Sequence, residues 1–247
     1  MLHYTLLQIA ATLKFALSKV SALAVIDPAS LCELLDYFLA REDDDLSLRE
    51  ETLRMLHACL YKNAELLNSR LREVIGPRLM HTLSYKNVVE IDLGPFKQKN
   101  DLGLPLRRLA LDCIEDVLLS GVSGAMNYGA LVVAAPKLLL DDETIRLHTH
   151  KLLVKLIQHS PALVTSSIDA LVEPLSKTLF AKIPETKKGP ELERATEVIR
   201  SAVKLSLVMD AIPELRNVPK WSELMAAIKK NASLSELSEN LKNASLS

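Results

Sequence analysis

The sequence is poor in several residue types, and each shortage excludes a class of protein. Only 4% of its 247 residues are aromatic, and it contains 7 glycines and 3 cysteines. Three cysteines in a chain of this length do not make a disulfide scaffold, so we expect a reducing compartment. The formal net charge is −1, whereas a nucleic-acid surface needs a clustered excess of Lys and Arg. Nucleic acid is therefore not an expected partner.

Long apolar runs and targeting signals are also missing. The uninterrupted apolar stretches are a few residues long, far short of the roughly 20 residues that cross a bilayer. The first residues include no basic segment and no small-residue cleavage site, so we expect no signal peptide and no membrane partner. The expected location of the protein is the cytoplasm and nucleus.

What the sequence does have is a repeating helical pattern. Between Leu106 and Leu118 the apolar residues follow the spacing of an amphipathic helix, and we assign Arg107 and Arg108 to its polar face. Related patterns begin at Ile9, Leu48, Leu106, Ile145 and Ala195, so successive starts lie 39, 58, 39 and 50 residues apart. An arginine directly follows three of these starts, and these are Arg49, Arg107 and Arg146. Such self-similarity indicates a repeat protein.

A second apolar helix is predicted after each of these starts. The predicted ranges are Pro28–Leu39, Leu66–Leu83, Tyr128–Leu140, Leu163–Phe180 and Pro219–Ile228. Helix pairs at a period near 40 residues are typical of HEAT repeats, which stack because one pair cannot bury its own apolar face. We predict an all-α, HEAT-type α-solenoid of about five helix pairs over residues 1–230, with a polar loop at 182–190. The polar segment 231–247 either caps the array or dangles.

The longest spacing contains an insertion at residues 85–104, between the second and third pairs. Val89, Ile91 and Leu93 alternate there with Glu90 and Asp92, which is the period-two pattern of a β-strand. The next residues, Gly94 and Pro95, indicate a turn, and Phe96 and Lys97 begin a return strand. We predict a small β-hairpin. Its apolar side either anchors a partner or caps the adjacent helix pair.

Several motifs resemble the C-terminal region of the cullin-associated and neddylation-dissociated (CAND) family. They are V-E-I-D-L-G-P-F-K at Val89–Lys97, D-L-G-L at Asp101–Leu104, the helix Ala110–Leu118, S-P-A-L-V at Ser160–Val164 and L-V-E-P-L at Leu171–Leu175. The resemblance covers about Thr5 to Phe180. Leu102 stands where the family has a second acidic residue.

The resemblance implies a non-enzymatic regulator of cullin–RING ubiquitin ligases. Its expected partner is the N-terminal, adaptor-binding part of a cullin, where the hairpin competes with substrate adaptors and so promotes exchange of substrate receptors. The implied partner-binding residues are Val89, Glu90, Ile91, Leu93, Gly94, Pro95, Phe96 and Lys97. Family members are several times longer, and the helix expected at Tyr4–Val20 is apolar from its start. We therefore also expect missing N-terminal repeats or a separate N-terminal chain of the same kind.

The sequence shows no residue pattern that is typical of catalysis or cofactor binding. His148 and His150 do not share a helix face, so they are poorly placed as joint metal ligands. We expect no catalytic residues, no cofactor and no metal, and we expect the cysteines (Cys32, Cys59 and Cys113) to be buried, inert thiols. The alternative to the cullin-binding function is a generic HEAT-repeat scaffold that binds a helical partner along its inner face.

Overall fold

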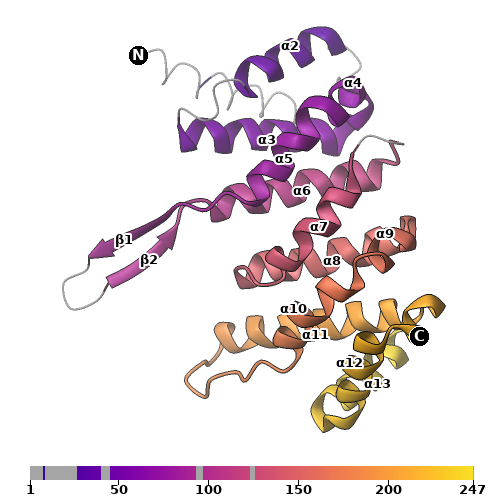
Figure 1. Cartoon of the computed structure of the whole chain (residues 1–247). Helices are drawn as coiled ribbons and strands as arrows, with labels where there is room; N and C mark the ends of the chain where they lie inside the picture. The colour runs from indigo at the N-terminus through magenta and orange to yellow at the C-terminus, as the bar shows by residue number, and fades with distance from the viewer. Residues whose placement is uncertain (1–7, 9–26, 40–44, 93–96, 123–125, 247) are drawn as a thin grey trace. The chain divides into compact units, whose positions relative to one another are not determined.

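A computed structural model of the chain describes residues 8, 27–39, 45–92, 97–122 and 126–246. Its fold is all-α with one two-stranded antiparallel sheet, which confirms the predicted fold class. The chain divides into two compact units, unit 1 from Met1 to Asn127 and unit 2 from Tyr128 to Ser247. Figure 1 shows the elements of each unit in chain order. The helix expected at Tyr4–Val20 falls almost entirely outside the described residues.

Unit 1 contains the first described helix pairs and the hairpin. Its elements are α2 (Pro28–Leu39), α3 (Leu46–Asn63), η3 (Ala64–Leu67), α4 (Asn68–Arg70), η4 (Leu71–Ile75), α5 (Gly76–Leu83), β1 (Val88–Asp92), β2 (Lys97–Asp101) and α6 (Leu104–Ser120). Helix α6 packs against α3 and α5, and α3 packs against α2. The apolar stripes predicted for α3 and α6 form the core, in which Met55, Cys59 and Ile114 are fully buried.

Local sequence explains where several of these helices begin and end. The Asp45 carboxylate accepts hydrogen bonds from the backbone N–H groups of Ser47 and Leu48, so it caps the first turn of α3. Helix α6 ends at Gly121, whose φ of 70° is the left-handed conformation that glycine adopts without steric cost. Asp45 therefore marks the start of α3, and Gly121 marks the end of α6.

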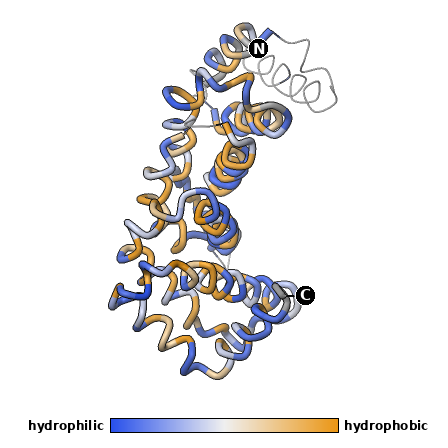
Figure 2. The backbone as a smooth tube through the Cα atoms, turned by 90° about the vertical axis from the view of Figure 1, so that its right-hand side faces the viewer, coloured by the Kyte–Doolittle hydropathy of each residue, from blue (hydrophilic) through white to orange (hydrophobic). Residues whose placement is uncertain are grey.

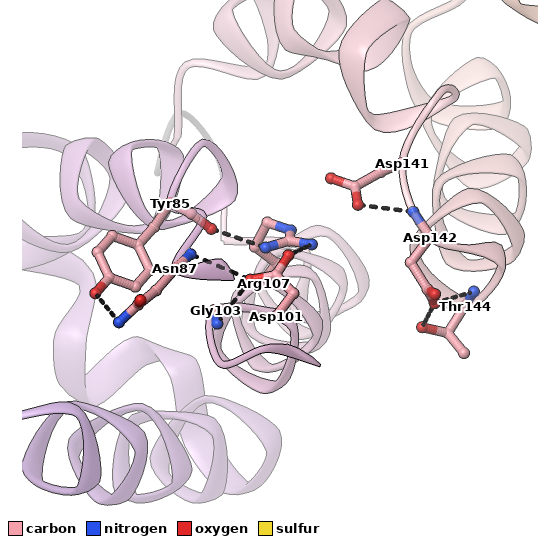
Figure 3. A network of polar contacts seen from close by, with 8 residues as sticks. All are labelled: Tyr85, Asn87, Asp101, Gly103, Arg107, Asp141, Asp142 and Thr144. Atoms are coloured by element: carbon pink, nitrogen blue, oxygen red, sulfur yellow. Dashed lines mark hydrogen bonds and ion pairs between the residues drawn. The ribbon is translucent and has the colours of Figure 1, made fainter. Parts of the chain in front are cut away.

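Unit 2 continues the same pattern of packed helices. Its elements are α7 (Tyr128–Leu138), α8 (Glu143–His159), α9 (Pro161–Thr165), α10 (Ile168–Leu179), α11 (Pro190–Asp210), η5 (Pro213–Asn217), α12 (Pro219–Lys230) and α13 (Ala232–Leu246). Helix α8 packs against α7 and α11, and α10 packs against α11 and α12. Asp142 caps α8 by accepting a hydrogen bond of 2.9 Å from the Thr144 N–H (Figure 3). Figure 2 shows the alternation of apolar and polar residues along these helices.

Some predicted helices differ from the observed ones in their internal structure. The range 66–83 is helical but contains 3₁₀, α and π segments in turn, and the range 163–180 is divided between α9 and α10. The C-terminal segment was expected either to cap the array or to dangle. Its helix α13 packs against α11 and α12 and buries Leu234. Among the described residues, no helix combines the length and apolar character needed to cross a membrane.

Candidate functional site

The insertion forms the predicted hairpin, and its strands are exposed. Strand β1 pairs antiparallel with β2 so that Ile91 lies opposite Gln98 and Glu90 lies opposite Lys99. Figure 1 shows the two strands extending away from the helices of unit 1. Ile91 is 42% exposed. The strands therefore continue neither as helix nor into the core.

Strand register gives the hairpin two chemically different faces. Directly opposite residues share a face, so Glu90 and Lys99 lie on the same side as Asp92 and Lys97. The other face holds two apolar side chains and two amides, which are Val89, Ile91, Gln98 and Asn100. The charged face carries charges of both signs, and Lys97 Nζ lies 4.0 Å from Glu90 Oε2. The uncharged face is the better candidate for an interface, because interface cores are depleted in charge.

The base of the hairpin is fixed by an ion pair between a buried arginine and a partly exposed aspartate. The Arg107 side chain is 1% exposed, and its Nη2 donates to Asp101 Oδ2 at 2.9 Å. Its Nη1 also donates to the backbone oxygen of Tyr85 at 2.8 Å, so one guanidinium joins both ends of the insertion (Figure 3). Asp101 Oδ1 accepts from the backbone N–H groups of Asn87 and Gly103 at 3.1 and 2.9 Å. These contacts set where the two strands leave the helices.

The protonation state of Asp101 follows from these contacts. Burial by itself raises the pKa of this carboxyl, but hydrogen bonds from Arg107 and from the Asn87 and Gly103 N–H groups outweigh it and hold the pKa below its usual value. Asp101 is therefore ionised at neutral pH, as a charge-assisted pair with Arg107 requires.

Tyr85 links this base to the preceding repeat. The guanidinium carbon of Arg49 lies 4.5 Å from the centre of the Tyr85 ring, a cation–π arrangement, and Arg49 Nη2 donates to Thr82 Oγ1 at 3.1 Å. Arg49 is buried like Arg107. The backbone at Gly103 also lies close to the backbone at Tyr85, since a Cβ at Gly103 would lie 2.7 Å from the Tyr85 oxygen. Two repeat arginines thus hold the residue that leads into β1.

The assignment of Arg107 to the polar face of its helix was wrong. The structure buries Arg107, because the ends of the insertion fold over it and supply an oxygen atom and a carboxylate as partners. Burying a guanidinium is tolerated only when such partners are present. One sequence signal could have indicated that Arg107 is buried, namely that an arginine follows the first apolar position in three of the repeats.

The predicted partner-binding residues are only partly described by the structure. Val89, Glu90 and Ile91 lie on β1 and Lys97 begins β2, so four of the eight belong to the hairpin strands. The remaining four, Leu93, Gly94, Pro95 and Phe96, lie outside the described residues. The role of all eight in binding a partner stays a prediction.

Three titratable side chains inside the helices, Cys59, Cys113 and His150, are kept neutral by burial. Burial raises the pKa of Cys59 to about 12 and raises that of Cys113 well above its usual value, so both thiols are unreactive. His150 Nδ1 lies 2.7 Å from Ser201 Oγ in the core of unit 2, and burial together with the positive charge of Arg146 lowers its pKa to about 3. His150 is therefore neutral. Within the described ranges, no cluster of three His, Cys, Asp or Glu side chains could hold a metal ion.

Comparison with known proteins gives matches over most of the chain. Residues 66–229 match the TIP120 family model, described as TATA-binding protein interacting (TIP20). Cullin-associated NEDD8-dissociated protein 2 of Mus musculus is 28% identical over 217 residues, which cover 87% of this chain and 18% of that protein. Cullin-associated NEDD8-dissociated protein 1 of Dictyostelium discoideum is 28% identical over 204 residues, 81% of this chain and 16% of that protein.

A third relative is itself described as part of a protein. The C-terminal part of cullin-associated NEDD8-dissociated protein 1 of Emericella nidulans is 26% identical over 193 residues, which cover 76% of this chain and 18% of that protein. The chain therefore spans less than a fifth of the length of these relatives. The family match includes the hairpin and its base.

Proposed function

Because the chain belongs to the TIP120 family of cullin-associated NEDD8-dissociated proteins, we propose that it is a non-enzymatic, cullin-binding regulator of cullin–RING ubiquitin ligases. The proposal transfers to this chain the association that the relatives' names state for those proteins. In the proposed complex, the helical repeats of this chain contact the N-terminal, adaptor-binding part of the cullin. The chain then acts by occupying a binding surface and performs no bond-making step.

One observation carries this proposal, the exposed hairpin on a buried base. Its sequence lies in the segment that resembles the family, and its uncharged face presents the side chains of Val89 and Ile91. Because Arg107 and Asp101 already fix the base, less conformational entropy is lost when the strands bind. An exposed apolar surface on a pre-ordered support is what an interface anchor needs.

The proposed mechanism is competition for one site on the cullin. A hairpin that fills the groove used by a substrate adaptor excludes the adaptor, and the adaptor in turn excludes the hairpin. Each partner therefore weakens the apparent affinity of the other, as linkage requires. Repeated binding and release of this kind lets one substrate receptor replace another.

A replacement of the strands tests the role of the hairpin. Residues 89–100 are replaced by a short Gly/Ser linker, and Tyr85, Asn87 and Asp101 are kept so that the base retains its contacts. We expect binding to an unneddylated cullin–RING pair to persist in weaker form and displacement of the adaptor to be lost. The control is Leu119→Ser, which changes an apolar residue of α6 that is 56% exposed. Unchanged adaptor displacement by a folded variant would support the generic scaffold instead.

We further propose that the chain acts together with N-terminal repeats, on the same polypeptide or on a separate one. The support is the small share of each relative that the chain covers. A pull-down of the cullin–RING pair, with and without the N-terminal repeats of a relative, measures their contribution. We expect tighter retention when both parts are present, because two linked contacts raise the effective concentration of each. Equal retention would contradict this part of the proposal.

A further inference from the structure

Unit 2 contains an arginine equivalent to Arg49 of unit 1, but it lacks the aromatic ring that covers Arg49. Arg49 follows Leu48 and Arg146 follows Ile145 in equivalent helices, α3 and α8. The helices match in detail, since the hydroxyls of Thr52 and Thr149 each donate to the backbone oxygen four residues earlier at 2.8 Å. The two arginines therefore occupy the same position in two copies of one repeat.

The residues that face these arginines can be matched as well. Thr82 is the next-to-last residue of α5 and Thr178 is the next-to-last residue of α10, and each donates to the backbone oxygen four residues before it. Tyr85 follows Thr82 by three residues, so Ala181 takes its place in unit 2. A methyl group thus stands where unit 1 has the aromatic ring that covers Arg49.

A cavity of about 90 Å³ lies beside Arg146 where the ring is missing. Its lining includes Thr178, Ala181, Lys182 and Lys187, together with Glu143 at the start of α8. A water molecule needs about 10–15 Å³ of such space, so the cavity has room for a carboxylate group. The polar loop 182–190 therefore forms one wall of a small chamber, in addition to connecting two helices.

The lining of the cavity is positively charged. Three cations, Arg146, Lys182 and Lys187, face a single carboxylate, that of Glu143. Lys187 Nζ lies 2.6 Å from Glu143 Oε1, so these two charges compensate each other. Within the described residues, no hydrogen bond or ion pair joins the Arg146 guanidinium to another residue, and its Nε is buried. A partly buried guanidinium beside open space favours a planar anion that can accept two parallel hydrogen bonds.

We propose that this cavity binds the carboxylate of an Asp or Glu side chain from an acidic segment of a partner protein. Arg146 supplies the two-pronged contact and Lys182 adds positive charge at the cavity. The site belongs to unit 2, and its existence does not depend on the role proposed for the hairpin.

Titration of the full chain with defined anions tests the proposal. The probes are a blocked triglutamate peptide, a blocked triglutamine peptide and inorganic phosphate, and the readout is the NMR signal of the arginine Nε–H groups. We expect saturable shifts of the Arg146 signal with triglutamate and none with triglutamine. An equal response to phosphate would overturn the assignment to an acidic peptide, and no saturable response to either anion would overturn the site itself.

Two variants and a control sharpen the test. Arg146→Lys keeps the positive charge but removes the planar guanidinium that can donate two parallel hydrogen bonds, so we expect triglutamate to bind about tenfold more weakly. Ala181→Tyr supplies the ring that unit 1 carries at Tyr85, and we expect it to fill the cavity, abolish binding and raise the thermal midpoint. Arg194→Lys changes an exposed arginine of α11 outside the lining and should leave binding unchanged. Equal binding by wild type and both cavity variants would contradict the proposal.

Discussion

The base and the strands of the hairpin are only a few residues apart, but they are held in opposite ways. At the base, the Arg107 side chain is 1% exposed and lies 2.9 Å from Asp101. In the strands, Ile91 is 42% exposed and the Glu90–Lys97 ion pair lies in solvent. Removing one partner of an ion pair costs more when the pair is desolvated than when both charges lie in solvent, where screening leaves the pair with little effect on stability. The comparison teaches that the base determines stability and position, while the strands are free to contact a partner.

Breaking the Arg107–Asp101 pair should have the largest effect on stability. Arg107→Met removes a cation that holds both the Asp101 carboxylate and the Tyr85 oxygen. We expect the free energy of unfolding of unit 1 to fall by about 2–3 kcal/mol, because the partly exposed Asp101 carboxylate and the Tyr85 oxygen both lose a charged donor. Denaturant unfolding measures this change.

The adjacent arginine provides a matched control for that prediction. Arg108 is exposed on the same turn of α6, so Arg108→Met should change the free energy of unfolding by less than about 0.5 kcal/mol. Similar losses for the two variants would show that the contrast between buried base and exposed surface does not govern stability here.

Crowding the backbone at the base should have the next largest effect. Gly103→Ala places a methyl group 2.7 Å from the Tyr85 oxygen, closer than a Cβ atom can lie. We expect a loss of about 1–3 kcal/mol, because the two backbone segments must separate. Hydrogen exchange should then be faster at the Leu102 N–H, which donates to the Asn87 oxygen at 2.8 Å. Unchanged exchange and stability would contradict the close packing of the base.

The charge of Asp101 should give the base a dependence on pH. Because the native pKa of Asp101 lies below its unfolded value, the ionised carboxylate stabilises the native state above the unfolded pKa. That stabilisation is lost as the pH falls through the native pKa. We expect a carbon-13 titration of the Asp101 carboxyl to give a midpoint below 3.8, the ordinary value. A midpoint above 3.8 would mean that burial outweighs the hydrogen bonds.

A change in the strands should have the smallest effect on stability and a clear effect on binding. Ile91→Ser alters an exposed side chain, so we expect the free energy of unfolding to change by less than about 0.5 kcal/mol. Loss of an interface anchor should weaken cullin binding about fivefold or more. Lys99→Ser, on the charged face, should weaken binding less. A larger effect from Lys99 would assign the interface to the charged face.

The architecture was largely predictable because it depends on local periodicity. The apolar spacing from Leu48 and Leu106 determined two core helices, and the alternation from Val89 to Asp92 determined a strand. Helix α13 was harder to recognise because its Ser and Asn content resembles a tail. Leu234, Leu237 and Leu241 nevertheless recur at helical spacing, and that signal could have identified it.

The base of the hairpin could not be predicted in the same way. Its contacts join Arg107 to Tyr85, 22 residues earlier, and to a carboxylate at the other end of the insertion. Periodicity places a side chain on a face but does not say which distant segment covers that face. The cavity beside Arg146 has the same origin, because it depends on an alanine where another repeat has a tyrosine.

Site-specific crosslinking would test the central claim most directly. A photo-crosslinking amino acid replaces Ile91 on the uncharged face or Arg108 on α6, and each variant is irradiated with an unneddylated cullin–RING pair. We predict that position 91 crosslinks to the N-terminal part of the cullin, that excess adaptor abolishes this crosslink, and that position 108 gives none. A crosslink from position 91 that persists at saturating adaptor, or none from a variant that still binds the cullin, would contradict the account.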